Sequence, residues 1–347
     1  MLSRGVRELA RRWLPALEAT PATAGLHTEA AQIYSERLAS PGAGSGPTAD
    51  TGTICVVHGL LGVGRNLATL TRTLLARAEQ QSGRPWQAVL LDQRCHGRSG
   101  HLGLPPPHIL AASAEDILRL FSSGLEYADA PDVLIGHSLG GKVCLELTAQ
   151  MSRLGKPPSQ ARHGNGTLTS MLRGRRRTWV LDSWPFRARE SFGELRDTER
   201  VLDAVAAIPQ PLPSREALYQ RLGEQGFSEG LQQWLGSNLR QRGKGQYVWQ
   251  FDLEGARSML EDYCTQDYTD LLTTPPPGTT IHMVRALESD RWTEESVETL
   301  RGLAAVPGMA DRGVLEYHEL PDAGHWVHVD NPQGLLDMIA PSLSKTL

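Results

Sequence analysis

A serine between two glycines stands at the junction of an expected buried strand and an expected helix. The apolar residues 133–138 end in Ser138, and residues 139–153 have a helical pattern, so Gly136 and Gly140 flank the serine as G-x-S-x-G. A tight strand-to-helix turn of this kind exposes a serine hydroxyl, because glycine leaves room for the strained backbone. Ser138 is therefore the candidate nucleophile, and the N–H of Leu139 at the helix start could stabilise an oxyanion.

A histidine late in the chain could act as the general base for this serine. His325, between Gly and Trp, follows the last expected strand (317–322). There an imidazole can take the serine proton and later deliver it to a leaving group. His328 is a weaker candidate close by. Near the start of the chain, His58 and Gly59 end the expected strand 53–59, which makes the N–H of Leu60 the candidate second oxyanion donor.

Two aspartates could orient the base. Asp182 ends the expected strand 178–183, whereas Asp290 follows the expected strand 279–286. Both positions put a carboxylate at the carboxyl edge of a parallel sheet, where ligands of open α/β sheets bind. The positions of these residues alone leave both assignments open.

The elements that carry these residues alternate between strand and helix. The expected strands are continuous apolar runs, which is typical of a parallel sheet with helices on both faces. Residues 185–275 interrupt this alternation with a long helical pattern, which predicts a helical cap over one edge of the sheet. The expected strands are 53–59, 88–94, 133–138, 178–183, 279–286 and 317–322, and the expected helices are 66–81, 113–124, 139–153 and 335–343. Ser113 is the expected N-cap of its helix.

Five segments together resemble the small esterases of the α/β-hydrolase superfamily, which include compact bacterial esterases and their mitochondrial abhydrolase-domain and plant plastid relatives. The segments are VVHGLLG (56–62), LDQRCHGRS (91–99), GHSLGGK (136–142), VLDSWP (180–185) and AGHWVH (323–328). The resemblance implies an α/β-hydrolase fold over residues 26–347. It also favours Asp182 as the acid and keeps Asp290 as the alternative, because Ser289 falls where other hydrolases carry the acid.

The resulting hypothesis is a serine hydrolase that cleaves the carboxylic ester or thioester of a small-molecule acyl substrate, with no metal or other cofactor. One alternative is a catalytically idle hydrolase-fold binding protein. Another is a nucleotide binder, because residues 136–142 fit part of a P-loop, but Val143 stands where a P-loop needs Ser or Thr for magnesium. A net charge of −4 gives no reason to expect nucleic acid as a partner. The oligomeric state stays open.

The first residues have a different character from the rest of the chain. Arg4, Arg7, Arg11 and Arg12 alternate with apolar residues at helical spacing, which resembles an organelle transit peptide over residues 1–25. The expected destination is a chloroplast or mitochondrion, and a surface helix of a cytoplasmic protein is the alternative. No apolar run is long enough for a membrane span.

A basic stretch and a cysteine each have a structural explanation as well as a functional one. The basic stretch 155–177 is expected to be a solvated loop, with an anionic partner as the alternative. Cys95 lies beside His96, where it could be a reactive thiol or an inert buried cysteine.

Overall fold

The computed structural model describes residues 32–43, 50–123, 130–154, 176–188, 193–309 and 311–344, without the side chains of 193–196. All of them belong to one compact unit. The expected transit peptide (1–25) and residues 155–175 of the basic loop lie outside the described residues, so both stay predictions.

The centre of this unit is a seven-stranded sheet with the strand order β1-β3-β2-β4-β5-β8-β9. All six expected strands are present and pair in parallel, which confirms the fold class. A short edge strand, β1, pairs antiparallel with β3 and was not predicted, because it is only half-buried and lacks a long apolar run. The strands are β1 (Ser35–Ala39), β2 (Gly52–Val57), β3 (Trp86–Leu91), β4 (Val133–His137), β5 (Arg176–Leu181), β8 (Thr279–Ala286) and β9 (Val314–Leu320).

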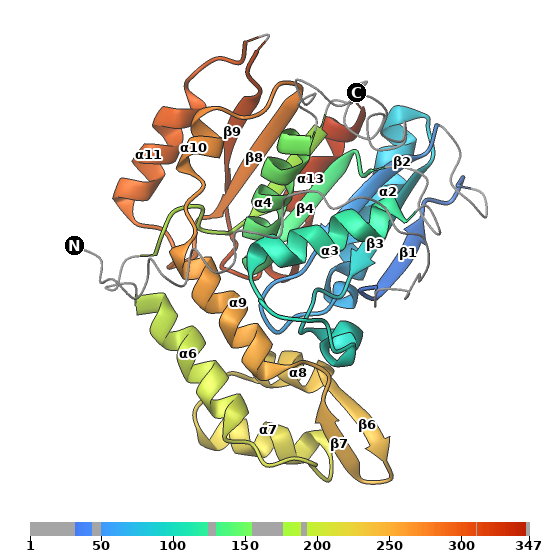
Figure 1. The fold of residues 1–347 in the computed structure, drawn as a ribbon, viewed down its shortest axis with the longest axis vertical. Helices are drawn as coiled ribbons and strands as arrows, with labels where there is room; N and C mark the ends of the chain where they lie inside the picture. Colours follow the sequence, from blue (N-terminus) through green and yellow to red (C-terminus); the bar gives the residue numbers. More distant parts are fainter. Residues whose placement is uncertain are drawn as a thin grey trace, which may run out of the picture. The chain divides into compact units, whose positions relative to one another are not determined.

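Helices cover both faces of the sheet (Figure 1). On one face, α2 (Ala68–Ser82) and α13 (Pro332–Ser344) bury leucines and isoleucines against the strands. On the other face lie α3 (Leu110–Ser122), α4 (Leu139–Leu154) and α11 (Glu294–Ala304). This burial on both faces explains why the central strands are continuously apolar in the sequence.

The chain between β5 and β8 forms the cap, which lies at one end of the sheet in Figure 1. The cap has its own apolar core, to which Leu202, Leu218, Leu235 and Leu260 contribute. Its sequence pattern predicted helices alone, but the structure adds a β-hairpin whose turn contains Gly245 at φ +67°. The cap elements are α6 (Gly193–Ala206), α7 (Arg215–Glu224), α8 (Glu229–Ser237), β6 (Leu239–Gly243), β7 (Gln246–Trp249), α9 (Leu253–Thr265) and α10 (Thr269–Thr273).

The start of α3 differs from the sequence expectation. The helix begins at Leu110, so Ser113 lies inside the first turn, and its hydroxyl donates to the side-chain oxygen of Gln93 instead of capping the helix. The N–H of Leu110 is satisfied by the carboxylate of Asp262 from α9, at 2.8 Å. A partner that is distant in sequence therefore replaces the local N-cap.

Within the described residues, no helix combines the length and the apolar character that crossing a membrane requires.

Candidate active site

Ser138 occupies a strained turn between β4 and α4. Its φ is +53°, in the left-handed region that residues with a side chain rarely adopt. The N–H of Ser138 donates to the carbonyl oxygen of Leu181 in β5 at 3.0 Å, and the Ser138 carbonyl oxygen accepts from Gly141 N–H at 2.8 Å. A Cβ on Gly136 would collide with the carbonyl of Gly140, which explains the glycine before this turn. The turn leaves Ser138 partly exposed.

His58 fixes the direction of the loop that follows β2. Its Nε2 accepts from the N–H of Gln93 at 3.0 Å, so its Nδ1 carries the proton and donates to the carbonyl oxygen of Gly59 at 2.7 Å. In a trans peptide the C=O and the following N–H point in opposite directions. The N–H of Leu60 therefore points away from His58. Among the described residues, neither this N–H nor that of Leu139 has a hydrogen-bond acceptor, and both residues line the pocket around Ser138.

His325 lies in the loop between β9 and the short helix α12 (Val327–Asp330). Its Nδ1 is 2.8 Å from Oδ2 of Asp182, and its side chain is 16% exposed. The backbone of the same loop is held by His137, whose Nε2 donates to the carbonyl oxygen of His325 at 2.7 Å. With Nδ1–H donated to the carboxylate, the lone pair of His325 is on Nε2.

Asp182 has a fully buried carboxylate and a backbone φ of +42°. Its Oδ1 accepts from Ala286 N–H at 3.1 Å and from the indole N–H of Trp292 at 2.6 Å. Its Oδ2 accepts from the hydroxyl of Ser289 at 2.7 Å as well as from His325. Burial alone would raise the pKa of Asp182, but the hydrogen bond and charge of His325, with the donors Trp292 and Ser289, lower it below its ordinary value.

The structure thus brings Asp182, and not Asp290, to His325. Asp290 is exposed to solvent. The preceding residue, Ser289, is the one that turns inward and donates to the Asp182 carboxylate.

The electrostatic surroundings of His325 favour its neutral form. Burial is the main cause of its lowered pKa, and the positive charge of Arg291 lowers it further, while Asp182 opposes both. His328, the weaker candidate, is also held neutral by burial, with a pKa near 4. A neutral imidazole at pH 7 is the form that a general base requires.

Ser138 and His325 open into one cavity of about 220 Å³ between the sheet edge and the cap. Its walls are mostly apolar, and the cap supplies much of them. The cap residues that line the cavity include Val201, Leu202, Leu231, Trp234, Leu260 and Tyr263.

Two charged residues near the sheet edge have structural partners. Arg94 pairs with Asp116, at 2.7 and 3.0 Å. The carboxylate of Asp92 instead accepts backbone N–H groups at 2.8 and 2.9 Å from Gly64 and Arg98.

Lys142, the lysine of the P-loop alternative, is fully buried. Its ammonium donates to the carbonyl oxygens of Phe186, Tyr263 and Gln266 at 2.6–2.8 Å. Because an ammonium has three protons, these bonds leave no donor for a phosphate.

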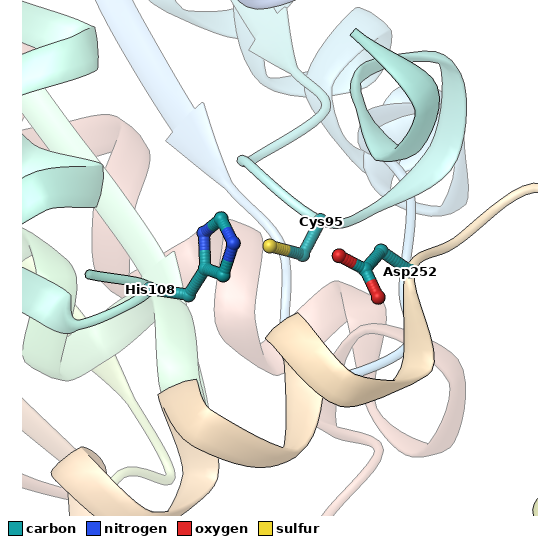
Figure 2. A group of neighbouring side chains, drawn as sticks. All are labelled: Cys95, His108 and Asp252. Carbon is teal, nitrogen blue, oxygen red and sulfur yellow. The ribbon is translucent and has the colours of Figure 1, made fainter. Parts of the chain in front are cut away.

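Cys95 lies next to His108 and Asp252, with its sulfur between the imidazole and the carboxylate (Figure 2). Burial, together with the negative charge of Asp252, raises the pKa of the thiol to about 12. The inert explanation therefore fits this cysteine better than a reactive thiolate does.

Sequence reasoning missed three residues that surround the candidate triad, namely His137, Arg291 and Trp292. In the sequence, His137 is only the variable position of the serine motif. Trp292 is close in sequence to Ser289, but no pattern indicated that its indole would reach Asp182.

Comparisons with known proteins agree with this architecture. A family model described as "Alpha/beta hydrolase family" matches residues 56–338. The sn-1-specific diacylglycerol lipase ABHD11 of Mus musculus is 25% identical over 297 residues, which cover 84% of this chain and 80% of the relative. The protein of the same name from Danio rerio is 25% identical over 292 residues, covering 84% and 78%.

Solved structures show the same fold at low identity. A marine microorganism esterase superposes with a TM-score of 0.64 at 17% identity, covering 88% of this chain and 97% of its own. An esterase of M. tuberculosis gives a TM-score of 0.54 at 18% identity, covering 90% and 92%. The family model spans the elbow, the Asp182 strand end and the His325 loop, and on this match the chain belongs to the alpha/beta hydrolase family.

Proposed function

We propose that this chain is a serine hydrolase that cleaves a carboxylic ester or thioester through an acyl-enzyme on Ser138. The observation that carries the proposal is the pairing of His325 Nδ1 with the buried carboxylate of Asp182, in a cavity that Ser138 also lines. This arrangement supports a neutral base with its free lone pair on the ring nitrogen opposite the carboxylate.

In the proposed first step, Oγ of Ser138 attacks the substrate carbonyl carbon while Nε2 of His325 takes the hydroxyl proton. The carbonyl oxygen becomes an oxyanion, and the N–H groups of Leu60 and Leu139 donate to it. Asp182 stabilises the imidazolium that forms and keeps its ring in place.

The tetrahedral intermediate then collapses. The bond from carbon to the leaving oxygen or sulfur breaks, and the imidazolium of His325 gives its proton to the leaving alcohol or thiol. The same imidazole then takes a proton from water, whose oxygen attacks the acyl carbon. The bond from this carbon to Oγ of Ser138 breaks, and the imidazolium returns the proton to Oγ, which releases the acid and the free serine. None of these proposed steps needs a metal or other cofactor.

The walls of the cavity favour an apolar acyl group. Leucines, valine and aromatic residues of the cap surround the space above Ser138. Because the curated relatives are named sn-1-specific diacylglycerol lipases, a diacylglycerol is the first natural substrate class to test, beside short-chain esters and acyl thioesters.

The direct test is covalent labelling with a fluorophosphonate probe. The wild-type protein should be labelled and Ser138→Ala should not, and kcat for an ester substrate should fall by about 10⁴- to 10⁶-fold in the variant. Circular dichroism on both proteins controls for folding. A folded wild-type protein without labelling or turnover would favour the idle binding protein.

We also propose that residues 1–25 direct the chain to a chloroplast or mitochondrion. The support is the arginine-rich amphipathic pattern alone. A fluorescent protein fused after residue 25 should enter the organelle, and a diffuse cytoplasmic signal would refute this proposal.

A further inference from the structure

Two histidines and a glutamate meet on the last two strands of the sheet, apart from the candidate active site. His282 lies on β8, and Glu316 is its direct neighbour in the register with β9. His318 is two residues after Glu316, so both side chains project from the same face of β9. Ala286, which donates to Asp182, ends β8 four residues after His282, so the group lies at the middle of the two strands and the candidate triad at their carboxyl ends.

The three potential ligand atoms lie close together. His282 Nδ1 is 3.1 Å from His318 Nε2 and 3.2 Å from Oε2 of Glu316, and His318 Nε2 is 3.6 Å from the same oxygen. Zinc binds histidine nitrogen and carboxylate oxygen at about 2.0–2.2 Å, so two ligand atoms in a tetrahedral site are about 3.3–3.6 Å apart. The observed triangle needs shifts of only a few tenths of an ångström to fit this spacing.

The site is partly pre-organised. The ring of Trp179 stacks on His282 with centroids 3.9 Å apart, and it also stacks on His318 at 5.2 Å. These contacts hold both imidazoles in place. The side chain of His282 is 6% exposed, whereas those of His318 and Glu316 are 26% and 47% exposed, so one side of the triangle is open to solvent.

Without a metal, a proton on His282 Nδ1 can link the three side chains by hydrogen bonds. His282 Nδ1–H can donate to Glu316 or share its proton with His318. A neutral His318 ring has a lone pair on one of its two nitrogens, which is available to a cation. A divalent cation would displace the shared proton and satisfy all three atoms at once.

We propose that His282, Glu316 and His318 form a zinc site, with the fourth position open to water. Two imidazoles and one carboxylate suit Zn²⁺ better than Ca²⁺ or Mg²⁺, which prefer oxygen ligands. The ion would cross-link the edge strand β9 to β8. Because β9 leads into the loop of His325, the cross-link would stabilise the part of the sheet that carries the base.

The group in Figure 2 is the natural competitor for the metal. Cys95, His108 and Asp252 also offer three ligand atoms, which lie within 4.8 Å of one another. In this second group, however, burial raises the pKa of the Cys95 thiol to about 12, so the thiol would have to lose a strongly held proton before it could bind the metal. A substitution in this second group is therefore the matched control.

The test uses the full chain after treatment with a chelator. ZnCl₂ is titrated against a chromophoric zinc indicator, and the Tm is followed over the same range of free zinc. The wild-type protein should bind one zinc ion at the site, and its Tm should rise with the logarithm of free zinc. His318→Gln and Glu316→Gln should each weaken binding by about 100-fold, because each removes one of three ligands and the loss of an outer-shell partner alone costs about 10–100-fold. His108→Gln should bind like the wild type.

Glu316→Gln keeps the size of a half-exposed side chain, so it tests the site even where His318→Gln does not fold. As a second measurement, Co²⁺ bound to the wild-type protein should give a tetrahedral visible spectrum without a thiolate charge-transfer band. The proposal is overturned if Glu316→Gln binds zinc as tightly as the wild type, if His108→Gln loses the binding, or if the cobalt spectrum shows thiolate. None of these readouts depends on hydrolase activity.

Discussion

Replacing Asp182 by asparagine tests the role of the buried carboxylate with almost no change in size. In the native structure Oδ1 faces two groups that can only donate, Ala286 N–H and the indole of Trp292. An asparagine amide must therefore place its oxygen there, since the opposite orientation would leave both donors facing an NH₂ group. The amide NH₂ then faces Nδ1 of His325 in place of Oδ2.

This orientation forces His325 into the wrong tautomer. To accept from the amide, Nδ1 must lose its proton, and the ring carries it on Nε2, where the lone pair for the Ser138 proton is needed. Ser289 can rotate its hydroxyl to accept instead of donate, so the fold should survive. In a catalytic triad this wrong tautomer costs about 10⁴-fold in kcat, or about 5.4 kcal/mol in activation free energy.

The assay is kcat and KM for a chromogenic acyl ester, with the Tm as a control for folding. Asp290→Asn is the matched substitution of an exposed carboxylate in the neighbouring loop. It should stay within a few-fold of the wild type. A near-normal kcat for Asp182→Asn, or a larger loss for Asp290→Asn, would refute the assignment of the acid.

Three further predictions concern the surroundings of the triad. Arg291→Gln removes a positive charge that disfavours imidazolium, so the pKa of His325 should rise and the acidic limb of the kcat/KM profile should move to higher pH. Arg291→Lys keeps the charge, and a profile that moves equally in both variants would contradict this reasoning. Lys142→Met leaves three buried carbonyl oxygens without this donor and should lower the free energy of unfolding by about 1–3 kcal/mol. Because burial lowers the pKa of Lys142 to about 7, the loss is measured by denaturant titration at pH 6, where the lysine is charged, against the exposed control Lys244→Met. Trp234→Ala removes an indole from the apolar wall and so enlarges the cavity. The acyl chain length with the highest kcat/KM should therefore increase, and an unchanged chain-length profile would place the acyl group elsewhere.

The strands and the serine elbow could be predicted because their causes are local. A strand buried on both faces is apolar along most of its length, as 133–136 is before His137. The glycines around Ser138 are required by the turn itself. Residues at carboxyl ends of parallel strands share an edge, so Ser138 and Asp182 could be placed near each other without any side-chain detail.

What could not be predicted depends on contacts between distant parts of the chain. By their positions after strands, Asp290 and Asp182 both suited the role of the acid, and only the family resemblance favoured Asp182. In the structure the direction of the loop after β8 separates them, because it turns Ser289 inward and Asp290 outward. Similarly, Asp262 caps a helix that is distant in sequence, so a search for local caps chose Ser113 instead. The hairpin of the cap was missed because its strands are short and mostly polar on the exposed side.

The buried side chain of Lys142 joins α4, the helix after the serine turn, to the cap helix α9. It lies in the first turn of α4, directly after the elbow, and two of its three acceptors, Tyr263 and Gln266, belong to the end of α9. Tyr263 also lines the cavity above Ser138. Separating α9 from α4 would break charge-assisted hydrogen bonds in a buried place, where such bonds are costly to lose. The distance between this wall of the cavity and the serine is therefore fixed by the fold, and the size of the acyl group should be selected by a preformed cavity instead of by movement of α9.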